Sequence, residues 1–315
     1  MKVKLLITGG LGYIGSFTAR SFLSKNKSKP FVIDNLSRGN IFSKKYSKFY
    51  KYNISDKKIK RLIIQNKINT IFHLAAFTCV RESEKKTKKY FNNNYKAQIK
   101  FIKNIKETTV RYFIFSSSLS IFEKNKFKFN PSSYSKYKLK IEKYLSRIAS
   151  PNFKVVILRY PNIIGSVQTG ELGEKNNYIS RIVPSFYKNI LNKKENILYY
   201  DYKNKEFPAR NYMHVIDIAN LNLKVIYNYI KFKKKFSVFN VFNKNYYSNY
   251  QVLKTLSDIL KIKPRYLLKQ ISHKESIIPI YKSSNNIFKF LNCRPKYKNL
   301  KKMLRTNIKW FKKIY

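Results

Sequence analysis

Acidic side chains are scarce in this chain. Among its 315 residues, 15 are Asp or Glu and 67 are Lys or Arg, which gives a formal net charge of +52 and an isoelectric point near 10.2. Such a charge is typical of proteins that bind nucleic acids or anionic membranes. The lysines, however, are spread along the whole chain, and the residue types with A/T-rich codons (Lys, Asn, Ile, Tyr, Phe) are all abundant. We therefore attribute the charge to codon composition and expect nucleic-acid binding to be weak and salt-sensitive.

Cysteine and histidine are also rare, and long apolar runs are missing. Cys79 and Cys293 are too few for a disulfide framework and suit a reducing compartment. His73, His214 and His273 show no metal-ligand spacing, so we expect no metal site. No apolar run is long enough to cross a bilayer, and the short one in "MKVKLLITGG" predicts a strand rather than a signal peptide. We expect a cytoplasmic protein with no membrane partner.

Short β-branched and aromatic runs alternate with longer amphipathic segments in the first half of the chain. We expect strands over residues 2–8, 30–34, 48–53, 69–75, 111–117 and 154–160. We expect helices between them, over about 14–26, 56–67, 86–107 and 134–149. This order predicts an α/β fold with a Rossmann-type, doubly wound parallel sheet, which binds ligands at the carboxyl ends of its strands.

The alternation is weaker after residue 165. A loop rich in Gly and Asn over 166–177 precedes helical segments near 178–192, 215–230 and 249–261. We expect residues 1–165 to form a dinucleotide-binding domain, to which residues about 210–240 return. Residues 166–315 are expected to form mainly a smaller C-terminal α/β domain that binds the substrate.

Half of the chain's eight glycines lie in one stretch, "TGGLGYIG" (8–15), between the first expected strand and the first expected helix. The stretch fits two phosphate-binding patterns, one using Gly10, Gly12 and Gly15 and the other using Gly9, Gly12 and Gly15. Such a turn needs a residue that tolerates positive φ, and close approach of a pyrophosphate to the backbone leaves no room for a Cβ. The helix N-terminus would add free N–H groups and a favourable dipole.

An acidic residue ends the second expected strand. Asp34 lies near the distance from the glycines at which a carboxylate binds the adenosine ribose hydroxyls. Because a carboxylate repels a 2′-phosphate, we expect NAD rather than NADP. Arg38, four residues further on, is an argument for NADP.

The stretch "PSSYSKYKLKIE" (131–142) holds Tyr134 and, one helical turn later, Lys138. The spacing alone carries little information, because it recurs at Tyr199/Lys203, Tyr227/Lys231, Tyr229/Lys233, Tyr250/Lys254 and Tyr297/Lys301. Position distinguishes Tyr134 and Lys138, since they begin an expected helix soon after a strand that ends at Ser118.

Several stretches, in order and over almost the whole chain, resemble the extended short-chain dehydrogenase/reductases (the NAD-dependent epimerase/dehydratase family), and within it the UDP-hexose 4-epimerases. They are "TGGLGYIGS" (8–16), "IDNLSRGN" (33–40), "HLAA" (73–76), "VRES" (80–83), "YFNNN" (90–94), "FIFSSS" (113–118), "YSKYK" (134–138), "LRYPNIIG" (158–165), "TGELGE" (169–174), "RNYMHVIDIA" (210–219) and "FLNCRPKY" (290–297). The resemblance implies a homodimeric isomerase that uses NAD to epimerise UDP-galactose or UDP-glucose at C4 through a transient 4-keto intermediate.

The resemblance also implies roles for individual residues. Tyr134 would be the general base and acid for the sugar 4-OH, Ser118 would hydrogen-bond that hydroxyl, and Lys138 would hydrogen-bond the nicotinamide ribose. The positive charges of Lys138 and of oxidised nicotinamide would lower the pKa of the tyrosine. The implied cofactor contacts are Gly9, Gly12, Tyr13, Ile14, Gly15, Asp34, Asn35, Asn53, Ile54, Leu74, Ala75, Ala76, Asn93, Ser116, Tyr134 and Lys138. The implied substrate contacts are Ser118, Tyr134, Asn162, Arg210 and Lys274.

The chain departs from the family's pattern at several positions. Asn53 replaces an Asp that binds the adenine amino group, Thr78 replaces a common Lys, and Pro161 replaces an aromatic residue near the nicotinamide. Arg181 lies where some members have Asn, Lys274 lies where an Arg would hold the diphosphate, and the loop 123–130, which begins at Glu123, is shorter than usual. We expect these departures to affect substrate choice and rate rather than the chemistry of Ser118, Tyr134 and Lys138.

Three alternatives remain for the function. Dehydratases of this type resemble one another in having Asp-Glu after the strand-end Ser or Thr, whereas Leu119 and Ser120 follow Ser118 here, which argues against a dehydratase. An epimerase for a UDP-N-acetylhexosamine or a UDP-hexuronate stays open, because these enzymes differ mainly in pocket volume and charge. A basic nucleic-acid-binding protein on the same fold is less favoured, since it has no need of Ser118, Tyr134 and Lys138.

Overall fold

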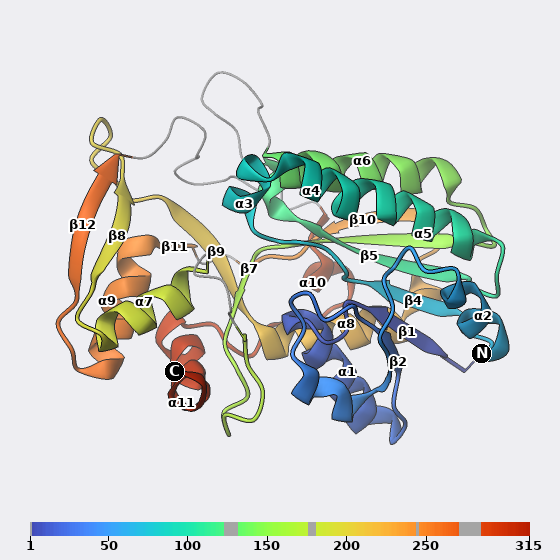
Figure 1. Cartoon of the computed structure of the whole chain (residues 1–315), viewed down its shortest axis with the longest axis horizontal. Coiled ribbons are helices and arrows are strands. Elements are labelled where there is room, and N and C mark those ends of the chain that lie inside the picture. The colour runs from blue at the N-terminus through green and yellow to red at the C-terminus, as the bar shows by residue number, and fades with distance from the viewer. Residues whose placement is uncertain (1, 123–131, 176–180, 244–245, 271–284) are drawn as a thin grey trace.

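The computed structural model describes residues 2–122, 132–175, 181–243, 246–270 and 285–315 (Figure 1). Its main element is a seven-stranded parallel sheet in the order β10-β6-β5-β4-β1-β2-β3. The strands are β1 (Leu5–Thr8), β2 (Phe31–Ile33), β3 (Lys48–Tyr50), β4 (Thr70–His73), β5 (Tyr112–Ser118), β6 (Lys154–Tyr160) and β10 (Phe236–Asn240). The buried apolar runs of the central strands β1, β4, β5 and β6 are those of strands covered on both faces.

Helices cover both faces of this sheet (Figure 1). Side chains alternate along β1, so that Leu5 and Ile7 join the core beneath one layer of helices and Leu6 joins the core beneath the other. The first layer contains α1 (Tyr13–Asn26) and α8 (Val215–Tyr227), which contact each other, and the second contains α2 (Lys58–Gln65), α5 (Ala97–Lys106) and α6 (Ser133–Ile148). The predicted Rossmann-type doubly wound fold is therefore confirmed.

The predicted helix over 86–107 is not continuous in the structure. The structure divides it into α4 (Thr87–Phe91), a π-helical turn η2 (Asn92–Lys96) and α5, and a further short helix, α3 (Val80–Lys85), precedes α4. Short 3-10 turns, which were not predicted, occur at η1 (Ile41–Tyr46), η3 (Leu119–Phe122) and η4 (Tyr229–Lys231). The π-turn lies beside the cavity described below, a common place for such turns.

The second half of the chain builds smaller sheets. β7 (Asn162–Ile164), β9 (Ala209–His214) and β11 (Tyr246–Ser248) form a three-stranded sheet, and β8 (Glu195–Tyr200) pairs in parallel with β12 (Arg265–Gln270). A third core lies around α7 (Ile182–Leu191), α9 (Asn249–Leu260) and α11 (Leu300–Ile314), while α10 (Ile287–Phe290) joins the first core. The sequence predicted α7 and α9 but not these short strands. Among the helices of the described ranges, none is both long and apolar enough to span a bilayer.

Candidate active site

Two cavities meet at the carboxyl ends of the parallel strands. The larger, of about 320 Å³, is lined by the glycine turn and by the ends of β2, β4 and β5. The smaller, of about 240 Å³, lies towards β8 and β9. The two cavities share Asn162, Ile163, Glu174 and Arg181, so they are neighbouring compartments of one cleft.

Every cofactor contact that the sequence analysis named lines the larger cavity. The set comprises Gly9, Gly12, Tyr13, Ile14, Gly15, Asp34, Asn35, Asn53, Ile54, Leu74, Ala75, Ala76, Asn93, Ser116, Tyr134 and Lys138. Of the predicted substrate contacts, Ser118 and Tyr134 line the larger cavity, Asn162 lines both and Arg210 lines the smaller one. Lys274 and the loop 123–130 lie outside the described residues.

The glycine turn decides between the two patterns seen in the sequence. Gly9 has a φ of +64°, and a Cβ there would lie 2.8 Å from the backbone nitrogen of Ala75. A Cβ on Gly15 would lie 2.5 Å from the carbonyl oxygen of Gly9. Gly10 is absent from the lining of the cavity, and a Cβ there would instead meet the side chain of Val32 at 2.6 Å. The pattern that faces the cavity is therefore Gly9, Gly12 and Gly15.

Helix α1 points its N-terminus into this turn. Gly12 is its N-cap residue, no side chain caps the first turn, and that turn carries no acidic residue. The N–H groups of the first turn and the helix dipole therefore favour an anion at this end. The Tyr13 hydroxyl donates a hydrogen bond to the Gly165 carbonyl oxygen at 2.5 Å, which fixes the start of α1 to the end of β7.

A buried polar chain supports the floor of the cavity. The Thr8 hydroxyl lies 2.6 Å from Nδ1 of His73, the other ring nitrogen of His73 meets Gln98, and Gln98 donates to the Ala75 carbonyl oxygen at 2.6 Å. Burial lowers the pKa of His73 to about 3, so the ring is neutral. His73 thus ties the ends of β1 and β4 together. The described ranges contain no group of three or more His, Cys, Asp or Glu side chains that could hold a metal ion.

Asp34 presents its carboxylate at the end of β2. It accepts hydrogen bonds from the backbone N–H groups of Leu36 at 2.8 Å and Leu11 at 3.1 Å, and burial raises its pKa. Asn53, where the family usually has Asp, accepts from the N–H and the hydroxyl of Ser55, both at 3.2 Å. A carboxylate and an amide therefore lie at the end of the cavity that the sequence analysis assigned to adenosine.

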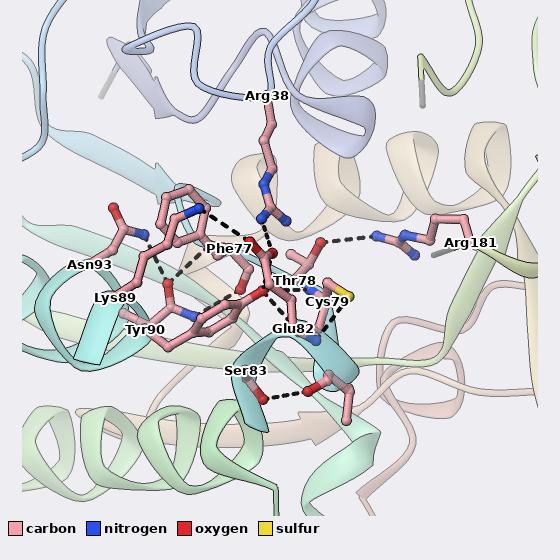
Figure 2. A network of polar contacts seen from close by, with 12 residues as sticks. Arg38, Phe77, Thr78, Cys79, Glu82, Ser83, Lys89, Tyr90, Asn93 and Arg181 are labelled. Atoms are coloured by element: carbon pink, nitrogen blue, oxygen red, sulfur yellow. Dashed lines mark hydrogen bonds and ion pairs between the residues drawn. The ribbon is translucent and has the colours of Figure 1, made fainter. Parts of the chain in front are cut away.

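The π-turn η2 brings Asn93 to the cavity and places Asn94 behind it. The amide of Asn94 accepts from the Phe77 N–H at 2.9 Å and donates to the Phe77 carbonyl oxygen at 2.8 Å. Asn93 donates to the side-chain oxygen of Asn94 at 2.9 Å (Figure 2). The turn therefore fixes both Asn93 and the loop that follows β4.

The start of α6 carries Tyr134 and Lys138. Ser132 caps the helix, accepting from the Ser135 N–H at 3.2 Å. Two side chains of α3 also hold this end: Glu84 accepts from the Ser133 N–H at 2.6 Å, and Ser83 accepts from the Tyr134 N–H at 3.2 Å. The sequence analysis quoted Ser83 in a family motif but assigned it no role.

Ser118, Tyr134 and Lys138 converge in the larger cavity. Ser118 lies close enough to the Tyr134 hydroxyl to lower its pKa, and Lys138 donates from Nζ to the Ser116 carbonyl oxygen at 2.5 Å. Tyr134 is 7% exposed and Lys138 is 5% exposed. Of the residues in the other five Tyr/Lys pairs, all of which the structure describes, Tyr199 alone lines one of the two cavities. Position, rather than spacing, therefore singles out this pair.

The electrostatics of the pair differ from the expectation that the charge of Lys138 lowers the pKa of Tyr134. Burial raises the pKa of Tyr134 to about 12, opposed by the positive charge of Arg181 and the hydrogen bond with Ser118. Burial lowers the pKa of Lys138 to about 7, opposed by Glu142. A lysine with that pKa loses its charge before such a phenol ionises. In the ligand-free protein Arg181 is therefore the cation that lowers the pKa of Tyr134, and the effect expected of Lys138 together with bound nicotinamide stays a prediction.

The smaller cavity has a basic lining. Arg81, Arg181 and Arg210 line it, and the Arg81 guanidinium lies over the ring of Tyr199, 4.5 Å from its centroid. Arg181 pairs with Glu174 at 3.2 Å and donates to the Thr78 hydroxyl at 3.2 Å, which links the start of α7 to the β4–α3 loop (Figure 2). This cavity suits an anionic ligand such as a diphosphate. Sequence reasoning noted Arg181 as a departure and missed Arg81.

A glycine turn after the first parallel strand, with a buried tyrosine and lysine across the same cleft, is the arrangement of the short-chain dehydrogenase/reductase class. The chain belongs to the NAD dependent epimerase/dehydratase family, whose model matches residues 5–241.

Known epimerases are similar to this chain over almost its whole length. A protein of Lactobacillus helveticus named UDP-glucose 4-epimerase is 27% identical over 326 residues, which cover 98% of this chain and 97% of the relative. The solved structure of a UDP-Glc/GlcNAc 4-epimerase of Campylobacter jejuni is 27% identical, covers 99% of this chain and 100% of its own, and has a TM-score of 0.81. The fold is also that of a UDP-glucose 4-epimerase of Bifidobacterium longum solved with NAD+ and UDP, at 24% identity, 98% coverage of both chains and a TM-score of 0.86.

Proposed function

We propose that this protein is an isomerase that interconverts UDP-glucose and UDP-galactose at C4, with NAD as its resident cofactor. The observation that carries the proposal is the meeting of Ser118, Tyr134 and Lys138 beside the glycine turn, next to the arginine-lined cavity. The names of the relatives support the same activity, and the Bifidobacterium longum relative was solved with NAD+ and UDP.

The residues present fit NAD. The backbone turn has no room for a side chain at Gly9 or Gly15 and little at Gly12, and α1 begins there without a side-chain cap. Asp34 supplies a carboxylate for the adenosine ribose. Held by this turn and by Asp34, NAD would supply the hydride acceptor and donor for oxidation and reduction at C4 of the sugar.

Tyr134 transfers the proton at the sugar, and Ser118 assists it by hydrogen bonding. Tyr134 takes the proton of the 4-OH while C4 is oxidised, and gives it back to the C4 oxygen when C4 is reduced, so no proton is gained or lost over a turnover. Ser118 hydrogen-bonds both the tyrosine and the reacting hydroxyl. Because the pKa of Tyr134 is about 12 even with the charge of Arg181 nearby, the tyrosine needs further positive charge, such as that of oxidised nicotinamide, to act as a base.

The nucleotide part of the substrate is held by the smaller cavity. Arg81, Arg181 and Arg210 provide cations for the diphosphate, and Asn162 lies at the border of the two cavities. With the nucleotide anchored there, the 4-keto sugar turns about its bond to the diphosphate and presents its other face to the cofactor side.

The proposal extends to the division of the chain into domains, its oligomeric state and its location. Residues 1–165, with about 210–240, bind the dinucleotide, and residues 166–315 mainly bind the nucleotide sugar; the pairing of β10 with β6 supports the return of the later segment. We propose a homodimer on the family resemblance, and a cytoplasmic location, which the two free cysteines, Cys79 and Cys293, support.

The test is a pair of measurements on purified protein. Mass spectrometry of released small molecules should detect nicotinamide dinucleotide, and UDP-galactose should be converted to UDP-glucose. Tyr134→Phe should lower the turnover at least about a hundredfold. Tyr137→Phe is the matched control on the same helix, since Tyr137 lines neither cavity. Full activity of Tyr134→Phe would contradict the catalytic assignment. Tight binding of nucleic acid at physiological salt, with no nicotinamide dinucleotide released from the protein, would favour a nucleic-acid-binding protein instead.

A further inference from the structure

The loop after β2 brings two side chains of opposite charge into the cofactor cavity. Asp34 and Arg38 both line it. In Rossmann-type sites a carboxylate at this place binds the ribose hydroxyls of NAD, whereas an arginine nearby accepts the 2′-phosphate of NADP. The sequence therefore contains arguments for both cofactors, and the partners of Arg38 bear on the choice.

Arg38 reaches away from its own loop to α3 (Figure 2). Its Nη2 donates to Oε2 of Glu82, and its guanidinium lies over the ring of Phe77, 4.6 Å from the centroid. The Arg38 side chain is 21% exposed and that of Glu82 is 17% exposed. Partial burial and the position of the guanidinium over the Phe77 ring make this pair stronger than an exposed ion pair.

Glu82 is itself held in place. Lys89 Nζ lies 3.2 Å from its Oε1, and the Tyr90 hydroxyl donates to its Oε2 at 3.0 Å. Burial alone would raise the pKa of Glu82, but the hydrogen bonds from Arg38, Lys89 and Tyr90 lower it to about 2. The carboxylate is therefore ionised at any working pH, and α3 and α4 fix its position.

These contacts decide what Arg38 offers to a ligand. To grip a 2′-phosphate, its guanidinium would have to leave the Glu82 carboxylate and the Phe77 ring, and would leave Glu82 with one cation fewer in a half-buried place. We propose that Glu82 determines the choice of NAD over NADP by holding Arg38 away from the adenosine ribose, where Asp34 then acts alone. The inference rests on the dinucleotide cofactor of the proposed function.

The test compares the affinities of the protein for NADH and NADPH. Bound cofactor is first removed, and binding is then measured by the fluorescence of the reduced nicotinamide. Wild type should prefer NADH. Glu82→Gln, which keeps the shape and removes the charge, should raise the affinity for NADPH about tenfold, the usual size of a charge-assisted hydrogen bond, and leave that for NADH nearly unchanged. Arg38→Gln in the Glu82→Gln background should cancel the gain. Glu107→Gln, which breaks the exposed pair with Lys60, is the matched control and should change neither affinity.

A second variant keeps the proposal open to refutation if Glu82→Gln does not fold. Because Glu82 holds Arg38, Arg38→Gln in the wild-type background should leave NADPH affinity nearly unchanged. A large loss of NADPH affinity in that variant would overturn the proposal, and so would an unchanged preference in folded Glu82→Gln. If wild type binds neither nucleotide, the proposed function fails together with the inference. If it binds NADH well and Glu82→Gln gains nothing, the inference alone fails.

Discussion

Lys138 donates a hydrogen bond from its buried ammonium group to the carbonyl oxygen of Ser116, with 2.5 Å between Nζ and the oxygen. The bond joins α6 to β5 inside the cofactor cavity. Burial lowers the pKa of Lys138 to about 7, while the charge of Glu142 raises it. The lysine therefore stands near its titration midpoint at neutral pH, and its cost to the fold depends on pH.

The sign of this dependence follows from linkage. Between about pH 7 and pH 10, Lys138 is mostly neutral in the folded protein and protonated in the unfolded chain, so the unfolded state binds more protons and stability rises with pH. This one group contributes up to about 1.4 kcal/mol per pH unit in that window. Lys138→Met should remove the contribution and flatten the slope. Urea unfolding of the cofactor-free wild type and Lys138→Met at pH 7, 8 and 9 measures the free energy of unfolding. If it changes with pH by the same slope in both proteins, the prediction is refuted.

Arg181 should shift the pH profile of the reaction. Its charge lowers the pKa of Tyr134, which burial raises to about 12. Arg181→Gln removes that charge, so the pKa of Tyr134 rises and the acidic limb of the kcat profile moves to higher pH. The KM for the UDP-sugar should also rise, because Arg181 lines the smaller cavity.

The control for this prediction is Arg147→Gln, which removes a charge from an exposed position at the end of α6. It should leave both the profile and KM in place. A raised KM with an unmoved profile would mean that Arg181 binds substrate without acting on the tyrosine.

Substitution of Gly9 and of Gly12 by alanine should have different effects on stability and on cofactor binding. Gly9→Ala forces an alanine into a φ of +64° with its Cβ 2.8 Å from the Ala75 nitrogen, so it should destabilise the fold by about 1–3 kcal/mol and abolish dinucleotide binding. Gly12 has an ordinary φ of −70°, and its added Cβ would lie 3.1 Å from the Gly9 oxygen.

Gly12→Ala should therefore keep most of the stability while losing cofactor affinity, because the methyl group crowds the cavity that Gly12 lines. Thermal unfolding without ligand and NADH titration separate the two effects. Equal losses of stability in both variants would contradict the distinction.

The sequence was informative wherever structure depends on neighbours in the chain. The buried parallel strands appear as continuous apolar runs, and the glycine turn and the Tyr134/Lys138 pair are local patterns, so the sheet and the main site residues were predictable. The strands β7, β9 and β11 were not, because they follow residue 161, where the regular alternation of strands and helices that marked the equally short β2 and β3 fades. The π-turn at 92–96 likewise has no simple sequence signal.

The contacts that tune the site were beyond sequence reasoning for a similar reason. Arg38 and Glu82 are 44 positions apart, Ser83 and Tyr134 are 51 apart, and Thr78 and Arg181 are 103 apart. No periodicity links residues at such separations, and in a chain with 67 basic side chains one arginine does not stand out. Packing of α3 against α6 and across the cleft creates these contacts, so they became visible only in three dimensions.

Ser83 is the last of these residues to test, as a positioning residue for Tyr134. Its hydroxyl accepts from the Tyr134 N–H at 3.2 Å and donates to the Val80 carbonyl oxygen at 2.6 Å, and the side chain is fully buried. Ser83→Ala removes the acceptor at the first turn of α6, which should cost about 1 kcal/mol of stability. It should also lower kcat about tenfold with little change in KM, because the tyrosine shifts while the nucleotide anchor stays in place.

Ser146→Ala provides the comparison on the same helix, since its hydroxyl bonds locally to the Lys143 carbonyl oxygen near the surface. It should change neither kcat nor KM. Steady-state kinetics with UDP-galactose, together with urea unfolding, measure the two effects of Ser83→Ala separately. A loss of stability without any fall in kcat would make Ser83 a structural residue of α3 and leave the placement of Tyr134 to Ser132 and Glu84, which hold the same end of the helix.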